Sequence, residues 1–220
     1  NKSSVMSAGK HQIPLPLNWS MISLPLAMKE MALKNTTNNA FTPMVNPAGC
    51  VREIWRYNSS LADPWEVVTY EDGFWIPGTG DENFTALEPG KGYWFFSNIT
   101  SNCNLTFVGS VPLNNRTYEL TSDLNLVGWY SEDNAELPDF CEPAYPFLVS
   151  PVNAIQILFY YNSTMQQFKG TFHFDDESCQ NNDWGWFPDS NSVEFTEIIP
   201  SRSYYVVTNA SSTWTIESFK

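Results

Sequence analysis

The side chains with the clearest capacity for chemistry in this chain are asparagines that can accept N-linked sugars. Ten Asn-x-Ser/Thr sequons occur, roughly threefold more than the composition predicts. A single sequon is also common turn chemistry, but ten together predict a glycosylated, solvent-facing surface. The predicted acceptors are Asn1, Asn18, Asn35, Asn58, Asn83, Asn98, Asn104, Asn115, Asn162 and Asn209.

The four cysteines, Cys50, Cys103, Cys141 and Cys179, form the second reactive group. Their spacing contains no C-x-x-C pair, which argues against a zinc ribbon or a thioredoxin-like site. In an exported protein we expect them to form disulfides, and three pairings are open. The internal repeat described below favours Cys50 with Cys103 and Cys141 with Cys179, because it places one pair in each half.

Catalytic and cofactor sites are not indicated. The two histidines, His11 and His173, lack the spacing of a metal site or a catalytic triad. The acidic loops Asp81–Glu82 and Asp175–Glu177 leave calcium open, but neither follows the EF-hand pattern, so solvated loops are expected. We therefore predict no enzyme and no cofactor. A glycosidase remains the open alternative, because two carboxylates flanking a cleft cannot be recognised from sequence alone.

Tryptophan offers a binding chemistry. Nine tryptophans are present, and Trp65, Trp184 and Trp186 are candidates for stacking on sugars. Trp75 and Trp186 occupy matching positions of the repeat, which favours a shared core role for both. Trp65 and Trp184 remain open to either interpretation.

Composition excludes several classes of function. The net charge of −13 is opposite to what phosphate binding needs, so no nucleic-acid partner is expected. For the same reason, and because the P-loop spacing is missing, Gly90-Lys91-Gly92 is interpreted as a structural corner. No apolar run approaches the roughly 18 residues of a membrane span. The first ten residues lack the apolar region of a signal peptide, which fits an extracellular, mature product.

An internal repeat organises the chain. With an offset of 111 residues, the stretch from Gly73 aligns with the stretch from Trp184, including Tyr93 with Tyr204 and the sequon Asn98 with Asn209. Two upstream blocks repeat in the same order. We predict two homologous domains with a tail before them and a linker between them. The predicted boundaries are 1–12 for the tail, 13–110 for domain 1, 111–116 for the linker and 117–220 for domain 2.

Within each domain the pattern is that of β-strands. Short segments rich in β-branched and aromatic residues, such as Arg52–Asn58 and Gly92–Ser97, alternate with Asn, Asp, Gly and Pro clusters. The exception is Leu26–Asn35, whose apolar spacing and good helix formers predict a short helix. The expected fold is all-β, with two tandem β-sandwich domains of the Ig-like kind and one helix in the first.

Three blocks carry a family resemblance. Leu17–Pro25, Ile54–Tyr57 and Leu87–Trp94 resemble the G-W-N-L-I-S-L-P, V-W-x-Y and L-E-P-G-K-G-Y-W blocks of a β-domain that recurs in bacterial and archaeal surface proteins. Domain 1 matches all three, whereas domain 2 has Pro200–Tyr205 in place of the glycine-rich turn. Similar tandem modules occur in extracellular adhesive, cell-envelope and fibril-forming proteins, so the resemblance implies structural material without catalytic residues.

These observations predict a structural subunit of an extracellular, heavily N-glycosylated fibril or surface layer. The N-terminal tail could act as a donor strand that joins copies of this chain head to tail, with Val5, Met6 and Ile13 as inserted side chains. Head-to-tail contacts do not close, so they generate filaments. The alternative is a cell-surface adhesin or a carbohydrate-binding module that uses exposed tryptophans.

Overall fold

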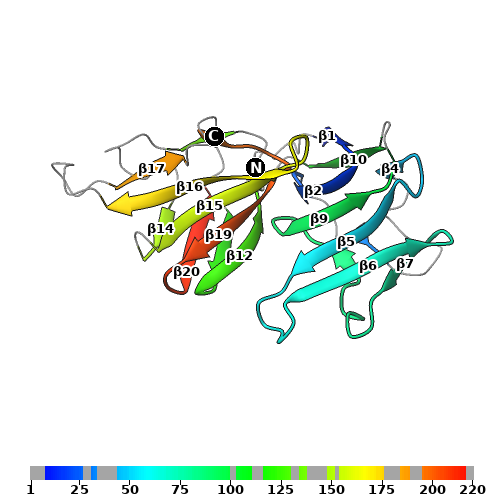
Figure 1. Cartoon of the computed structure of the whole chain (residues 1–220), viewed down its shortest axis with the longest axis horizontal. Helices are drawn as coiled ribbons and strands as arrows, with labels where there is room; N and C mark the ends of the chain where they lie inside the picture. The colour runs from blue at the N-terminus through cyan, green and yellow to red at the C-terminus, as the bar shows by residue number, and fades with distance from the viewer. Residues whose placement is uncertain are drawn as a thin grey trace, which may run out of the picture.

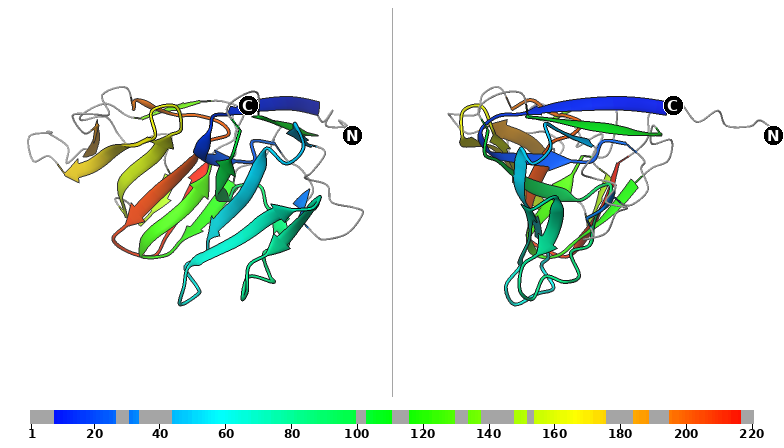
Figure 2. Two further views of the ribbon diagram at one scale, coloured as in Figure 1. Left: turned by 45° about the vertical axis from the view of Figure 1, so that its right-hand side comes forward. Right: turned by 90° about the vertical axis from the view of Figure 1, so that its right-hand side faces the viewer.

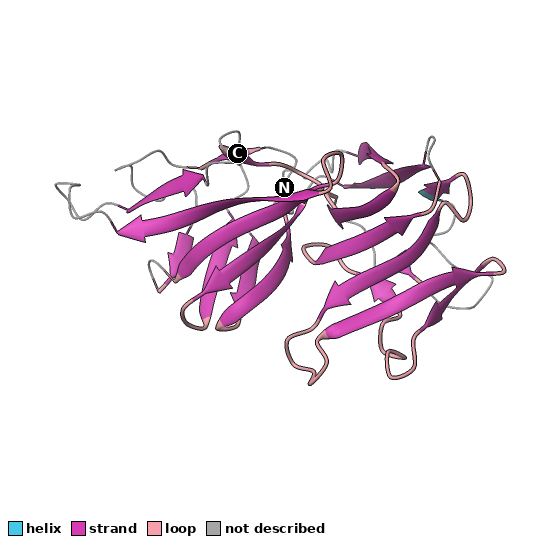
Figure 3. Ribbon diagram, viewed as in Figure 1, coloured by secondary structure: helices cyan, strands magenta, loops and turns pink. Residues whose placement is uncertain are grey.

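The computed structural model of the chain is built almost entirely from antiparallel strands, as Figures 1 and 3 show, which confirms the all-β prediction. It describes residues 8–26, 31–33, 44–99, 103–110, 116–129, 134–137, 148–151, 154–175, 184–188 and 195–216. Among these residues no helix has the length and hydrophobicity to cross a membrane. We refer to the described residues 8–110 as the first half and to 116–216 as the second half.

The first half contains three antiparallel sheets. Its five-stranded sheet has the order β2 (Asn18–Ser23), β9 (Gly92–Ser97), β5 (Val51–Tyr57), β6 (Trp65–Glu71) and β7 (Phe74–Pro77). Its three-stranded sheet has the order β1 (Ala8–Leu15), β10 (Cys103–Ser110) and β4 (Val45–Asn46). A small sheet pairs β3 (Met31–Ala32) with β8 (Ala86–Leu87).

The second half has the same three sheets in the same order. Its five-stranded sheet runs β12 (Asp123–Gly128), β19 (Ser203–Thr208), β15 (Ile155–Asn162), β16 (Gln167–Asp175) and β17 (Trp184–Pro188). Its three-stranded sheet runs β11 (Arg116–Leu120), β20 (Ser212–Ile216) and β14 (Leu148–Ser150). The small sheet pairs β13 (Ala135–Glu136) with β18 (Glu197–Ile198).

Each half has a core between its larger sheets. In the first half, Ile54 and Phe95 of the five-stranded sheet and Leu105 and Phe107 of β10 are at most 1% exposed and belong to one apolar cluster. In the second half, Leu158, Val206 and Trp214 take the corresponding roles. Alternate residues of each strand point into these cores, so the other residues of the five-stranded sheets point to the opposite face.

Strand register defines which positions of the two halves match. Asn18 pairs with Ser97 as Asp123 pairs with Thr208, and both Asn18 and Asp123 have a left-handed backbone, with φ of 76° and 77°. A bulge lies between Val51 and Glu53, and another lies at the matched residues Ile155 and Ile157. The strands therefore bend at the same place in both halves.

The glycine-rich turn of the first half has a counterpart without glycine. Gly90 has φ of 82°, and the matched Ser201 keeps this left-handed conformation with φ of 69°. Glycine adopts such angles at little cost, whereas serine is strained there, so surrounding contacts must stabilise the second turn. One such contact is the Ser201 carbonyl, which accepts a hydrogen bond of 2.9 Å from the Ser23 amide of the other half.

The two halves touch through reciprocal contacts. Isolated bridges join Ile22 to Arg202 and, at the matched positions, Val127 to Lys91. The Gly128 amide donates to the Gly90 carbonyl at 3.1 Å, which mirrors the bond between Ser23 and Ser201. The contact therefore resembles a two-fold interface in which the end of one strand meets the turn of the other half.

Two predicted elements differ in the structure. The described part of the predicted helix, Met31–Ala32, is strand β3, and the next amide, that of Leu33, donates to the Thr85 carbonyl at 2.8 Å. Pairing with β8 and burial of Leu33 override the helix propensity of this segment, so the helix prediction is wrong at these residues. The first strand also begins inside the predicted tail, because Ala8–Leu15 pairs along its whole length with β10 (Figure 2).

Candidate functional site

An aromatic groove lies where the outer faces of the two five-stranded sheets meet. It has a volume of about 430 Å³ and opens to solvent. Four tryptophans of the first half and two tyrosines of the second line it: Trp19, Trp55, Trp65, Trp94, Tyr161 and Tyr205.

The alternation of the strands places these rings on the outer face. In β5 and β9, Ile54 and Phe95 are directed into the core, so their neighbours Trp55 and Trp94 point the other way. The two tryptophans lie opposite each other across the β5–β9 pair. The sequence of β9 is aromatic at consecutive positions because both faces of this strand are covered.

The rings hold one another in place. The Trp19 centroid lies 6.3 Å from that of Trp55 and 6.1 Å from that of Trp94, both in edge-on geometry. Tyr161 of the other half approaches Trp94 to 4.9 Å. Such pairs are favourable beyond their buried area, so the groove wall is preformed.

Polar atoms are few and placed at the edge of the rings. The Trp94 indole donates to the Tyr205 hydroxyl at 2.8 Å, and the Trp55 indole donates to a Glu53 carboxylate oxygen at 2.9 Å. The Tyr161 hydroxyl donates to Gln166 at 3.1 Å. Burial raises the pKa of Tyr205 to about 12 and raises that of Tyr161, so both phenols stay neutral.

This arrangement is suited to binding. The six lining side chains are four indoles and two neutral phenols, and the nearby Glu53 carboxylate accepts a hydrogen bond from the Trp55 indole. Among the described residues no group of three or more His, Cys, Asp or Glu is placed to hold a metal ion. The geometry is that of an aromatic binding surface.

A buried ion pair lies on the core side of the same sheet. Arg56 donates to both carboxylate oxygens of Glu66 at 2.7 and 2.8 Å, and Asn58 donates to Glu66 at 3.2 Å. The guanidinium lies 4.4 Å from the Phe84 ring centroid. The hydrogen bond from Arg56 lowers the pKa of Glu66, which keeps this buried carboxylate charged. The pair is a structural element of the first half.

The seven predicted glycosylation sites within the described residues are all accessible to some degree. Asn18, Asn83, Asn98 and Asn209 are exposed, and Asn58, Asn104 and Asn162 are half-buried. Asn1, Asn35 and Asn115 lie outside the described residues. Asn58 directly follows β5 and the matched Asn162 is the last residue of β15, and each side chain also accepts a backbone hydrogen bond from the residue two positions on.

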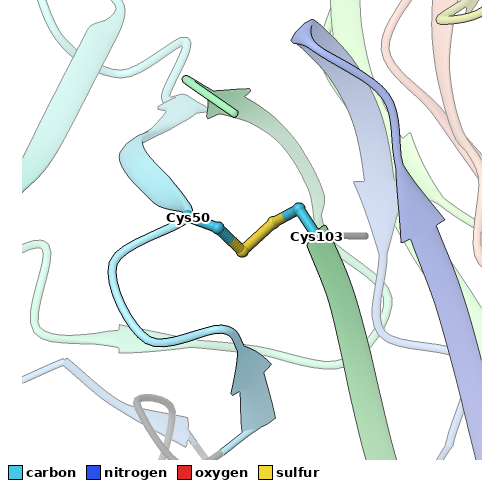
Figure 4. The surroundings of a disulfide bond; sticks show 2 residues. All are labelled: Cys50 and Cys103. Carbon is cyan, nitrogen blue, oxygen red and sulfur yellow. A yellow bond between two sulfur atoms is a disulfide. The ribbon is translucent and has the colours of Figure 1, made fainter. Parts of the chain in front are cut away.

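The Cys50–Cys103 disulfide forms as predicted and joins the residue before β5 to the first residue of β10 (Figure 4). Cys141 and Cys179 lie outside the described residues. The positions in the second half that match Cys50 and Cys103 are Ala154 and Ser212. A Cys141–Cys179 bond would therefore not be the counterpart of the first disulfide, and this pairing stays a prediction.

The predicted assembly segment lies in this chain's own sheet as far as it is described. Lys10 to Leu15 pair with β10, and Ile13 packs against the core of the first half. Val5 and Met6 lie outside the described residues. His11 contacts Ser201 of the second half, and burial lowers the pKa of the imidazole.

The predicted tryptophans and the acidic loop at Asp81 lie in different parts of the structure, and only one of the described residues among them lines the groove. Trp65 lines the groove, whereas Trp75 is 1% exposed and belongs to the core. The side chains of Trp184 and Trp186 lie outside what the structure describes. Asp81 accepts a hydrogen bond of 2.9 Å from the Val67 amide, which gives this acidic loop a structural role.

The sequence-based reasoning missed most of the groove. It singled out Trp65 but neither the other three tryptophans nor the two tyrosines. The available signal was the run of aromatic residues on both faces of β9, since a strand covered on one face only has apolar residues at alternate positions.

Comparisons with known proteins add no assignment. No family model matches the chain, and no curated protein or solved structure is significantly similar to it. Function must therefore be argued from the geometry.

Proposed function

We propose that this chain is a structural subunit of an extracellular, N-glycosylated fibril or surface layer, built from two homologous Ig-like domains. The observation that carries the proposal is the repetition of sequons at matched positions, Asn58 with Asn162 and Asn98 with Asn209. All four lie at or just beyond strand ends and none is buried. Sugars at these positions would project from both halves without disturbing either core.

The disulfide supports an oxidising compartment, because such bonds persist in exported proteins and are rare in the cytosol. The reciprocal contact between the halves supports a building-block role, since it turns two small domains into one unit with a continuous apolar layer between them. An array of such units needs a connection between copies.

The proposed connection is β1. Among the described residues it is the edge strand of the three-stranded sheet and pairs with β10 alone, through eight residues of ladder. The same ladder could form on β10 of a neighbouring copy, with Ile13 entering the neighbour's core as it enters its own here. Exchange of this kind is a low-cost route to assembly because no new contact has to be created.

Two measurements test the proposal. Mass spectrometry of the native protein is expected to find glycans at the matched pairs, and unmodified Asn58, Asn98, Asn162 and Asn209 would contradict it. Electron microscopy of protein from its source is expected to show filaments or arrays. Dispersed monomers would remove the assembly function.

Truncation tests the connection. Deletion of residues 1–12 removes part of β1 and is expected to abolish assembly, whereas deletion of residues 1–7 leaves Ala8–Leu15 intact and serves as the matched control. Normal assembly of the longer truncation would eliminate β1 as the connector.

A further inference from the structure

The aromatic groove is built differently by the two halves. At each of the four tryptophan positions of the first half, the matched residue of the second half has a smaller side chain, whereas Tyr161 matches Tyr57. Trp55 and Trp94 match Phe159 and Tyr205, Trp65 matches Phe168, and Trp19 matches Leu124. Packing of the two sheets is therefore satisfied by Leu, Phe and Tyr on one side, so filling the interface does not by itself require four indoles on the other.

An indole differs from a phenyl ring by its larger face and its N–H donor. Trp55 and Trp94 use this donor within the protein. Trp19 and Trp65 line the groove and are half-buried, and neither donates its indole N–H to another described residue. The groove thus combines exposed aromatic faces with two donors that remain for a ligand.

The charge of the groove restricts the ligand further. None of its six lining residues is charged, and the nearby acceptors are the Glu53 carboxylate and the Gln166 side-chain amide. The chain as a whole carries −13, so an anionic ligand would be repelled. The groove is open to solvent and lined by six rings, which suits a flat ligand lying across several of them better than a compact cation enclosed by an aromatic cage.

We propose that the groove binds a neutral oligosaccharide. The apolar C–H faces of pyranose rings would stack on Trp65 and Trp19, their hydroxyl oxygens would accept from the two indole N–H groups, and hydroxyl hydrogens would be donated to Glu53. Such a site combines a large apolar face with a few placed polar groups. This binding goes beyond the proposed structural role, and either can fail without the other.

The test is titration of the intact protein with chitohexaose, cellohexaose, mannohexaose and xylohexaose, followed by tryptophan fluorescence and calorimetry. The protein is used both as isolated and after enzymatic removal of its N-glycans, so that its own sugars do not compete. Saturable binding of at least one oligosaccharide is expected, with a Kd below about 1 mM.

Three variants locate the binding. Trp65→Ala is expected to weaken affinity about tenfold or more, as loss of a central aromatic contact does. Trp65→Phe introduces the residue type of the matched position, keeps a ring, and is expected to lose less. Phe74→Ala removes an exposed ring, 41% accessible, on the edge strand β7 and is the control with unchanged affinity.

The proposal is overturned by absence of saturable binding for all four oligosaccharides in both preparations. It is also overturned if the Trp65→Ala variant binds the sugars with the same affinity as the chain without a substitution. Saturable binding of tetramethylammonium in preference to the sugars would overturn it as well. Thermal melts of each variant establish folding, and Trp65→Phe keeps the test valid if Trp65→Ala does not fold.

Discussion

The two halves of this chain share strand order, register, bulge and turn conformation, yet their matched positions carry different chemistry. The first half holds a disulfide where the second has Ala154 and Ser212, and an Arg56–Glu66 ion pair where the second has Tyr160 and Lys169. The difference shows that the strand pairing and the turn conformations are common to both halves and specify the fold. The disulfide and the ion pair are not required for it, because other residues fill the same positions in the second half.

At the contact between the halves, matched positions also carry different residues, and there the distances leave little room for a substitution. Ser23 and the matched Gly128 face each other, and so do Gly92 and the matched Ser203. A Cβ at Gly128 would lie 2.5 Å from the Ser23 Cβ, and one at Gly92 would lie 3.0 Å from the Ser203 Cβ. A second side chain would clash at Gly128 and would be crowded at Gly92, where Leu126 lies closer still at 2.7 Å, so the contact favours two unlike halves over two copies of one half.

The largest loss of stability is expected when the two disulfide cysteines are replaced by the matched residues of the second half. Cys50→Ala with Cys103→Ser opens a loop that spans 53 residues and should lower the free energy of unfolding by about 4 kcal/mol. Urea denaturation followed by tryptophan fluorescence measures it. The reverse exchange, Ala154→Cys with Ser212→Cys, tests whether the second half gains stability. If the variant without Cys50 and Cys103 unfolds with the same free energy as the original chain, the disulfide does not stabilise the first half.

The ion pair comes next. Glu66→Gln leaves the Arg56 charge without its carboxylate in a site where Glu66 is 2% exposed, and should cost about 3 kcal/mol, the lower end for a broken buried pair because Arg56 keeps some access to water. Denaturant unfolding measures the loss, and Glu88→Gln, which removes a more exposed and more distant partner of Arg56, is the control.

The pH dependence of this pair has a defined sign. Because the folded-state pKa of Glu66 lies below its ordinary value of 4.5, the charged pair stabilises the fold above about pH 4.5 and this contribution is lost as pH falls through the folded-state pKa. The Glu66→Gln variant should lack that part of the acid destabilisation. An identical acid profile for variant and unmodified protein would refute the assignment.

A smaller effect is expected at the contact between the halves. Gly128→Ser overpacks the site, since the new Cβ would lie 2.4 Å from the Lys91 carbonyl oxygen as well as against Ser23, and should cost about 1–3 kcal/mol. Adding Ser23→Gly exchanges the two residues and should restore part of the loss. A double variant no more stable than the single one would show that the clash with the Lys91 carbonyl, and not the one with Ser23, determines the cost.

The smallest effect concerns His11, which joins β1 to the Ser201 turn of the other half. Burial lowers its folded-state pKa below 6.5, so the unfolded chain takes up the proton first and stability decreases as pH falls from about 6.5 towards the folded-state pKa. Denaturation midpoints at about pH 7.5 and about pH 5.5 should differ less for His11→Gln than for the unmodified chain. Equal differences would rule out this contribution.

The sequence predicted much of the fold because its signals are local. The β-branched and aromatic residues of segments such as Arg52–Asn58 indicate strands, and the repeat aligns Tyr93 with Tyr204, which the structure places at matched ladder positions. The helix prediction failed at Met31–Ala32 because pairing with β8 is a contact between distant segments that propensity does not contain.

The groove was not predictable for a related reason. Trp19, Trp55 and Trp94 come from three strands separated by up to 75 positions in the chain, and Tyr161 comes from the other half. Each of these aromatic residues fits a core role when its own strand is considered alone. Only the orientation of one sheet towards the other shows that the outer faces meet.

The position of the disulfide also determines how the first half responds to force. The chain enters β1 at Ala8 and leaves β10 at the paired residue Ser110, so tension applied there opens the ladder one rung at a time from that end. On the β10 side extension stops at Cys103, and on the β1 side it can continue as far as Cys50. The bond between them withholds the enclosed segment, about 180 Å of chain at roughly 3.4 Å per residue. The disulfide thus limits how far the first half can be extended under force, whereas the matched positions of the second half set no such limit.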